Sequence, residues 1–344
     1  MRHREIEEKA AEHNTNTLCE VADKVRAVKV VIYGTMKDKH LEALRAACPS
    51  AALVVAPTRA EAEAAVTDAH ALCLALDRGD GLREILRRGE RLEWLHCFFA
   101  GVEGILEPEL VESPLVLTNS AGVHAPPIAE HVIGVIIALA RNFPGLFRQQ
   151  RERVWFRNLP VDEIAGRTVG IVGLGGIGRL VAKKAKGLDM HVIGTKRHPE
   201  PVPYVDEVLP DDRLEDLLAR SDFVVIAVPS TPETVGLIGR SQLNKMKPSA
   251  YLINVARGNV VDQDALIAAL QDGRIAGAGL DVFDPEPLPA DSPLWGLPNV
   301  ILSPHCSARS PYINQRTVAL FAENLRRFAN GEDLINVVDK RRGY

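Results

Sequence analysis

The sequence predicts an α/β protein made of two doubly wound parallel-sheet domains. Apolar, strand-like runs alternate with helical patterns along most of the 344 residues, which is typical of parallel sheets covered by helices on both faces. The alternation pauses at 129–158 and then resumes, and this chain length suggests about two domains. We therefore expect two sheets, with a ligand site in the cleft between the two halves.

The first half contains five strand candidates. Residues 1–26 are polar and predict a helical extension whose role the sequence does not reveal. Helical patterns such as "DKHLEALRAAC" and "RAEAEAAVTDA" then separate the strand candidates. The five apolar runs are "KVVIYG", "AALVVAP", "ALCLAL", "LEWLHCFFAG" and "PLVLTNS". Runs of this length and composition are typical of strands that are buried on both faces.

The second half contains six strand candidates. A long apolar helix and the aromatic and basic stretch "FPGLFRQQRERVWFRNL" precede them. A closing helix is expected from about Tyr312 to Asn330, followed by a short strand, "INVVD". The six strand candidates are "TVGIVGLG", "MHVIGT", "DFVVIAVPS", "AYLINVA", "GAGLDVF" and "NVILSPH".

Composition and charge exclude several classes of protein. The chain is 46% hydrophobic and 25% charged, and its net charge of -4 argues against a nucleic-acid partner. No segment resembles a signal peptide or a membrane span, because Glu130, His131 and Arg141 interrupt the longest apolar run. The odd number of scattered cysteines, without CxxC spacing, predicts that the protein is located in the reducing cytoplasm and has neither a disulfide framework nor a metal site. The cysteines are Cys19, Cys48, Cys73, Cys97 and Cys306.

A glycine loop in "GIVGLGGIGRL" predicts a dinucleotide site. Gly173 permits the tight turn, Gly175 lets the backbone approach a pyrophosphate, and Gly178 allows close packing of helix and strand. Gly176 and Ile177 belong to the first turn of the following helix, whose free N–H groups favour phosphate binding. The other interpretation is an ordinary glycine-rich turn between a strand and a helix.

The residues after the next strand predict the preferred cofactor. An acid usually lies here to hold the adenosine ribose, but this chain has Thr195, Lys196 and Arg197. These residues can bind a 2′-phosphate through a guanidinium fork, a point charge and a hydroxyl donor. We therefore expect NADP(H) to be preferred. The alternative is a solvated pair of cations and a loosely held ribose, so that NAD(H) is used as well.

Polar residues follow three later strand candidates. Arg257 comes after "YLINVA", Asp281 and Glu286 come after "GAGL", and His305 ends "NVILSPH". In a parallel sheet these strand ends meet at one edge beside the glycine loop. A guanidinium, carboxylates and an imidazole there favour an anionic substrate that exchanges a proton. Taken singly, each of these residues is also compatible with an ordinary surface or loop position.

The segment "INVARGNVVDQDALIAALQDGRIAGAGLDVFDPEPLPADSPLWGLPNVILSPH" closely resembles the signature region of the D-isomer-specific 2-hydroxyacid dehydrogenases. The resemblance includes "SAGVHAPPIAEHVIG" and covers nearly all of 28–338, with the motifs in family order. It implies a flavodoxin-like substrate domain and a Rossmann nucleotide-binding domain. The expected boundaries are 1–26 for the extension, 27–125 plus 309–344 for the substrate domain, and 126–308 for the nucleotide domain.

The resemblance also implies a role for each polar residue. Arg257 would hold the substrate carboxylate and keto oxygen, His305 would be the acid–base, Glu286 would pair with His305, and Asp281 would lie beside the nicotinamide. The implied reaction is reduction of a small 2-keto acid, such as glyoxylate or hydroxypyruvate, to the D-2-hydroxy acid with NAD(P)H. A carboxylate beside a histidine fixes the ring tautomer and stabilises the imidazolium.

Other candidate residues lie in loops. The segments "CLALDRGDGL" and "FFAGVEGIL" resemble the family's substrate-carboxylate loops, which gives Leu76, Asp77, Arg78, Gly101 and Val102 as candidates. The other interpretation of these loops is a plain strand–loop junction. Cys306 is interpreted as a passive neighbour of the histidine. Further candidate cofactor contacts are Val228, Pro229, Thr234, Val255 and Ser307.

Other functions on this scaffold remain open at this point. Glu286 argues against formate dehydrogenases, which have glutamine there, and Ala100 stands where phosphite dehydrogenases have lysine. A nucleotide-sensing protein of the C-terminal-binding corepressor type is the alternative from a different class. The resemblance further implies a homodimer through 120–158, whose aromatic residues include Phe143 and Trp155. The alternative is a self-contained arm on a monomer.

Overall fold

The computed structural model describes residues 26–76, 81–102 and 104–343. The chain divides into two compact units. Unit 1 consists of the described residues up to Ala121 together with those from Tyr312 onward, and unit 2 is Gly122–Pro311. The predicted extension lies outside the described residues, apart from Arg26.

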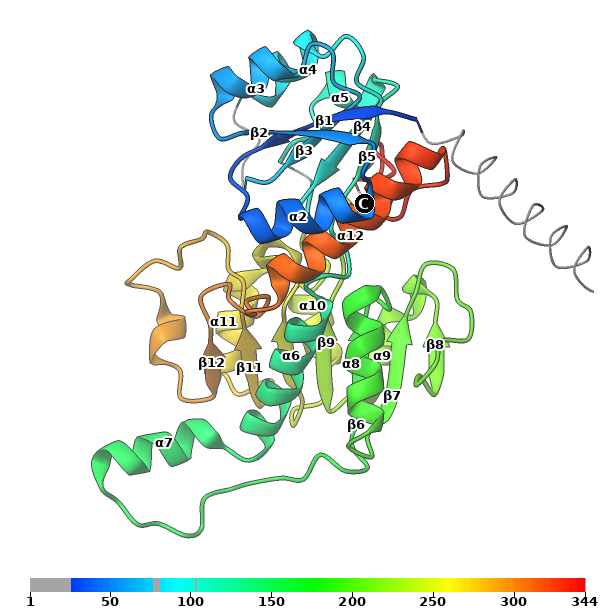
Figure 1. Ribbon diagram of the computed structural model, residues 1–344. Helices are drawn as coiled ribbons and strands as arrows, with labels where there is room; N and C mark the ends of the chain where they lie inside the picture. The colour runs from blue at the N-terminus through cyan, green and yellow to red at the C-terminus, as the bar shows by residue number, and fades with distance from the viewer. Residues whose placement is uncertain (1–25, 77–80, 103, 344) are drawn as a thin grey trace, which may run out of the picture. The chain divides into compact units, whose positions relative to one another are not determined.

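Unit 1 is a five-stranded parallel sheet with helices on both faces (Figure 1). The strand order is β2-β1-β3-β4-β5, so the five runs predicted in the first half are all strands of one sheet. Helix α2 (Asp38–Ala47) and α12 (Ile313–Asn330) cover one face. On the other face lie α3 (Arg59–Ala65), α4 (Leu82–Arg88) and α5 (Pro108–Glu112). The strands are β1 (Val28–Tyr33), β2 (Ala51–Ala56), β3 (Ala71–Leu74), β4 (Trp94–Cys97) and β5 (Val116–Thr118).

Unit 2 is a seven-stranded parallel sheet in the order β12-β11-β10-β9-β6-β7-β8. The strand order reverses beside β6, which is paired with β7 on one side and with β9 on the other. A reversal of this kind is where doubly wound sheets bind their ligands. The strands are β6 (Thr168–Val172), β7 (His191–Thr195), β8 (Glu207–Leu209), β9 (Phe223–Ile226), β10 (Tyr251–Asn254), β11 (Gly277–Leu280) and β12 (Val300–Leu302).

Helices cover both faces of the unit 2 sheet (Figure 1). α6 (Ala125–Ala140) and α8 (Gly176–Lys186) pack on one face around Val132, Ile136 and Val181. α9 (Leu214–Arg220), α10 (Arg240–Lys245) and α11 (Gln263–Gln271) pack on the other. Because both faces are covered, the strands are continuous apolar runs rather than alternating ones.

The structure differs from the sequence prediction in two strands. β8 was not predicted, because it has only three residues and begins with Glu207. The predicted strand "INVVD" is wrong: Val337 forms only an isolated antiparallel bridge with Thr118. Asn336 has a φ of 58°, and this left-handed conformation breaks the extended backbone that a strand requires.

The stretch after α6 contains a helix and a long irregular segment. α7 (Phe143–Glu152) and the chain that follows it extend away from the unit 2 sheet (Figure 1). Asn142 caps α7 by accepting a hydrogen bond from the Gly145 N–H at 3.2 Å. In the described part of the chain, no single helix has the length and apolarity to cross a bilayer. α6 and α7 satisfy those criteria only together, as a pair bent by 65°.

Candidate active site

The glycine loop forms an open cradle at the start of α8. Gly173 has a φ of 98°, and a Cβ there would lie 2.9 Å from the Ala227 carbonyl oxygen. A Cβ on Gly178 would lie 2.2 Å from the Gly173 carbonyl oxygen, so helix and strand can approach this closely only with glycine. A Cβ on Gly175 would meet nothing within 4 Å. Open space above free helical N–H groups fits the pyrophosphate of a dinucleotide.

The three residues at the end of β7 have different surroundings. Thr195 is buried, and its Oγ1 accepts a hydrogen bond from the Gly173 N–H at 3.2 Å. Thr195 therefore supports the glycine loop from behind, a position that the sequence did not reveal. Lys196 forms an ion pair with Glu200. Arg197 lies near Glu233. The pKa of Glu233 is lowered mainly by a hydrogen bond from the Thr231 side chain and also by the charge of Arg197.

Asp281 organises the loop that carries His305. Its carboxylate accepts hydrogen bonds from Ser303 Oγ at 2.6 Å, from the Cys306 N–H at 2.9 Å and from the Ser307 N–H at 3.0 Å. Burial alone would raise the pKa of Asp281, but these hydrogen bonds lower it. The residue is 1% exposed, so the carboxylate is satisfied from within the protein. It holds the Ser303 side chain before the histidine and the backbone after it.

His305 is held in an uncommon backbone conformation. Its φ is 47°, a left-handed value that costs a non-glycine residue about 1 kcal/mol or more. Its N–H donates to the Asp281 carbonyl oxygen at 2.8 Å, and the hydrogen bonds to the Asp281 carboxylate fix the residues that follow. Conformations of this kind persist where the surrounding structure enforces them, and they cluster at functional sites.

His305 and Glu286 form a hydrogen-bonded pair. The His305 Nδ1 lies 2.8 Å from Glu286 Oε2, and the Phe283 N–H donates to Glu286 Oε1 at 3.0 Å. Glu286 is therefore oriented by the backbone, and it in turn orients the imidazole. With Nδ1 directed at the carboxylate, Nε2 is the ring nitrogen that can exchange a proton with a substrate. The His305 side chain is 46% exposed, so a ligand can reach it.

Arg257 follows β10 in a turn shaped by Asn254. Asn254 Nδ2 donates to the Arg257 carbonyl oxygen at 3.0 Å, and Asn254 Oδ1 accepts from the Ala256 N–H at 3.0 Å. A Cβ on Gly258 would lie 1.9 Å from the Phe283 carbonyl oxygen. The Arg257 turn is thus packed directly against the loop that leads to Glu286. The geometry places a guanidinium and the His–Glu pair on neighbouring strand ends of unit 2.

Comparison with known proteins gives the family. Residues 133–307 match the D-isomer specific 2-hydroxyacid dehydrogenase, NAD binding domain. The chain is 39% identical over 273 residues to a glyoxylate reductase of Korarchaeum cryptofilum, covering 75% of this chain and 79% of that protein. The chain belongs to the D-isomer-specific 2-hydroxyacid dehydrogenase family. The predicted family, with its two parallel-sheet α/β domains and Rossmann nucleotide domain, is confirmed.

Solved structures of family members are similar over almost the whole chain. A D-isomer specific 2-hydroxyacid dehydrogenase from Xanthobacter autotrophicus, in complex with NADPH and MES, is 32% identical with a TM-score of 0.80. The similarity covers 92% of this chain and 100% of that chain. An NADPH-dependent glyoxylate/hydroxypyruvate reductase from Sinorhizobium meliloti, in complex with NADP and sulfate, is 27% identical with a TM-score of 0.79 and the same coverage.

As a member of this family, the protein is a 2-hydroxyacid dehydrogenase that uses a pyridine nucleotide cofactor. Among the remaining cofactor candidates, Val228 and Pro229 follow β9, which borders the glycine loop, whereas Val255 follows β10 and Ser307 follows β12. Val228 approaches that loop, since its Cγ1 would lie 2.8 Å from a Cβ on Gly173. The Pro229 carbonyl oxygen accepts from Thr234 Oγ1 at 2.7 Å, and Val255 and Ser307 are buried.

The substrate-loop candidates belong to unit 1. Val102 is 1% exposed, so its side chain belongs to the core and only its backbone could face a substrate. Leu76 packs against the same apolar cluster, and Gly101 is partly buried. Asp77 and Arg78 lie outside the described residues. The role of this set stays a prediction.

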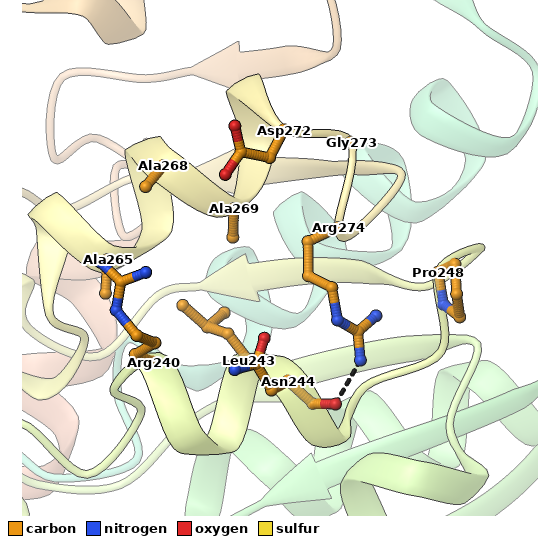
Figure 2. Close-up of a pocket in the computed structure, with 10 residues that line it drawn as sticks. All are labelled: Arg240, Leu243, Asn244, Pro248, Ala265, Ala268, Ala269, Asp272, Gly273 and Arg274. Atoms are coloured by element: carbon orange, nitrogen blue, oxygen red, sulfur yellow. Dashed lines mark hydrogen bonds between the residues drawn. The ribbon is translucent and has the colours of Figure 1, made fainter.

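A separate pocket of about 430 Å³ lies between α10 and α11 (Figure 2). Its Arg274 Nη2 donates to the carbonyl oxygens of Asn244 and of Met246, the latter at 2.9 Å. These carbonyls belong to the end of α10, so Arg274 caps that helix. Pro248 and Gly273, which also line the pocket, precede β10 and β11. The pocket therefore lies at the amino ends of these strands, whereas Glu286 and His305 follow the carboxyl ends of β11 and β12.

Proposed function

We propose that this dehydrogenase reduces a small 2-keto acid, such as glyoxylate or hydroxypyruvate, to the D-2-hydroxy acid with hydride from NADPH. The observation that carries the proposal is the His305 Nδ1 to Glu286 Oε2 contact of 2.8 Å in the domain that contains the glycine loop. The glyoxylate reductases among the relatives support this substrate class.

The reduction needs a hydride and a proton. The nicotinamide nucleotide supplies the hydride when it is bound. His305 Nε2 donates the proton to the new hydroxyl, and Glu286 stabilises the positive charge that His305 carries before the transfer. Arg257 binds the substrate carboxylate and the keto oxygen, where negative charge develops. Asp281 keeps the His305 loop in the required conformation.

An assay panel tests the reaction. Glyoxylate, hydroxypyruvate, pyruvate and larger 2-keto acids are supplied with NADPH and with NADH, and the stereochemistry of the product is determined. We expect turnover with the small 2-keto acids and a D-configured product from hydroxypyruvate. The absence of turnover, together with tight nucleotide binding, would instead favour the nucleotide-sensing alternative. The relatives named above are reductases and dehydrogenases, which favours the enzyme.

We expect NADPH to be preferred over NADH by at least ~10-fold in kcat/KM, which corresponds to about 1.4 kcal/mol. Lys196 and Arg197 stand where an acid would repel a 2′-phosphate. Replacing Lys196 with Asp and Arg197 with Gln should remove or reverse the preference. Equal kcat/KM for the two cofactors in the unmodified enzyme would contradict this assignment.

We also propose that the enzyme is a homodimer built through residues 120–158. This stretch exposes large apolar side chains: Phe147 is 58% exposed, Phe156 54% and Trp155 91%. Clustered apolar exposure of this kind is typical of surfaces that another chain covers. Burial of these side chains against a second copy would recover their hydrophobic free energy.

A further inference from the structure

Two cations from different elements converge on one carboxylate beside the glycine loop. Lys196, which follows β7, forms an ion pair with Glu200 Oε1. Arg179, in the first half of α8, places its Nη2 3.8 Å from the same oxygen. The pKa of Glu200 is lowered by its hydrogen bond with Lys196 and by the charges of Lys196 and Arg179. A single anionic group therefore lies at the meeting point of the two cations.

Arg179 is also tied to the glycine loop. Its Nε donates to the Leu174 carbonyl oxygen at 3.2 Å, which directs the rest of the guanidinium toward the end of β7. The Arg179 side chain is 50% exposed, so a ligand can replace Glu200 as its partner. The sequence alone did not single out Arg179 or Glu200, although Arg179 directly follows Gly178 and Glu200 lies four positions after Lys196.

The chain around Glu200 is stiff. Pro199 and Pro201 flank the residue. A proline fixes its own φ and restricts the residue before it to extended conformations. The Glu200 carboxylate is therefore presented to the cations with little loss of backbone freedom. Its side chain is 60% exposed, so it can rotate into solvent at low cost.

We propose that Arg179 joins Lys196 and Arg197 in the subsite for the adenosine 2′-phosphate, and that Glu200 is an internal counter-ion which the phosphate must displace. The inference rests on the proposed use of NADPH and adds two residues to it. A phosphate monoester carries up to two negative charges and three acceptor oxygens, so it can satisfy both cations better than one carboxylate oxygen does. Arg179 is then a specificity-determining residue, and Glu200 limits the affinity for the phosphorylated nucleotide.

The test compares two nucleotides that differ only in the 2′-phosphate. Adenosine 2′,5′-bisphosphate and adenosine 5′-monophosphate are titrated calorimetrically into the full-length enzyme. The ratio of their Kd values isolates the 2′-phosphate from the rest of the cofactor site. The variants are Glu200→Gln, Arg179→Gln and, as a matched control, Glu207→Gln. Glu207 is a partly exposed acid on the neighbouring β8, and its partner is Arg220.

Glu200→Gln should raise the preference for the bisphosphate by about three- to five-fold, the scale of an exposed ion pair. Arg179→Gln should lower it by about five- to ten-fold. Neither variant should change the affinity for the monophosphate by more than about two-fold. Glu207→Gln should leave the affinity for both nucleotides unchanged. Adding Lys196→Gln to Glu200→Gln should reduce the gain from the Glu200 change, because one of its two cationic partners is gone.

The outcomes separate this inference from the proposed cofactor preference. If the unmodified enzyme prefers the bisphosphate and the two variants leave that preference unchanged, the subsite assignment is wrong and the NADPH proposal stands. If the unmodified enzyme shows no preference but Glu200→Gln creates one, the counter-ion is supported and the proposed preference is wrong. Weaker monophosphate binding by Glu200→Gln would overturn the inference, since Glu200 would then be holding the ribose hydroxyls.

Discussion

His305 is the residue on which the proposed chemistry depends most directly. Replacing it with Ala removes the group that donates the proton, so turnover should fall by at least ~10²-fold, the usual scale for a general acid. The cofactor should bind with nearly unchanged affinity, because the glycine loop is formed by other residues. Steady-state kinetics and a nucleotide titration check both expectations. A variant that retains most of its turnover would exclude His305 as the acid.

Glu286 affects the same proton transfer through the other ring nitrogen, Nδ1. In Glu286→Gln the neutral amide can still hydrogen-bond His305 Nδ1, but it no longer stabilises the charged imidazolium. Turnover at neutral pH should fall by at least ~10-fold, and the pH–rate profile for reduction should move to lower pH. The profile is measured with saturating cofactor. An unchanged profile would remove Glu286 from the mechanism, even if the rate fell.

At the scale of elements, β4 and α12 enclose a histidine that no catalytic step uses. His96 is 0% exposed, its ring stacks on Phe321 with centroids 4.9 Å apart, and its Nδ1 lies 2.7 Å from Thr118 Oγ1. Within the described residues its Nε2 has no hydrogen-bond partner. Burial lowers the pKa of His96 from 6.5 to about 3.

This burial predicts loss of stability in acid. Below pH 6.5 the unfolded chain binds a proton at His96 that the folded chain does not, so stability falls between pH 6.5 and about 3. By pH 5 the loss from this group is on the order of 2 kcal/mol. Urea unfolding at pH 7.5 and pH 5 should show a smaller difference for His96→Leu than for the unmodified protein. Equal differences would refute the prediction, whatever the absolute stability of the variant.

The elements were predictable where burial on both faces makes a continuous apolar run. β1, β6 and β9 are of this kind, and so are the other long strands. β8 was missed because it is short and polar at its start. The "INVVD" segment was wrongly predicted because one left-handed residue, Asn336, determines its conformation, and no apolar pattern records such a residue.

The sequence allows the polar residues of the candidate site to be proposed, but not the hydrogen bonds that they make. Arg257, Asp281 and His305 follow apolar runs, and parallel strands bring such positions to one edge. The hydrogen bonds that Asp281 makes around His305 depend on loop geometry, and so does the burial of Thr195 behind the glycine loop. Contacts of this kind arise from tertiary packing, which spacing along the chain does not encode.

At the scale of the whole molecule, the proposed dimer accounts for the exposed arm. Trp155→Asp combined with Phe156→Asp places two carboxylates in the proposed interface, where their desolvation opposes association. Light scattering at micromolar concentration should give about twice the 37.5 kDa chain mass for the unmodified enzyme and about one chain mass for the variant. Trp295→Asp is the control, because Trp295 is also exposed, at 58%, but lies outside 120–158. This control should remain dimeric. One chain mass for the unmodified enzyme would rule out the dimer, and the arm would then belong to a monomer.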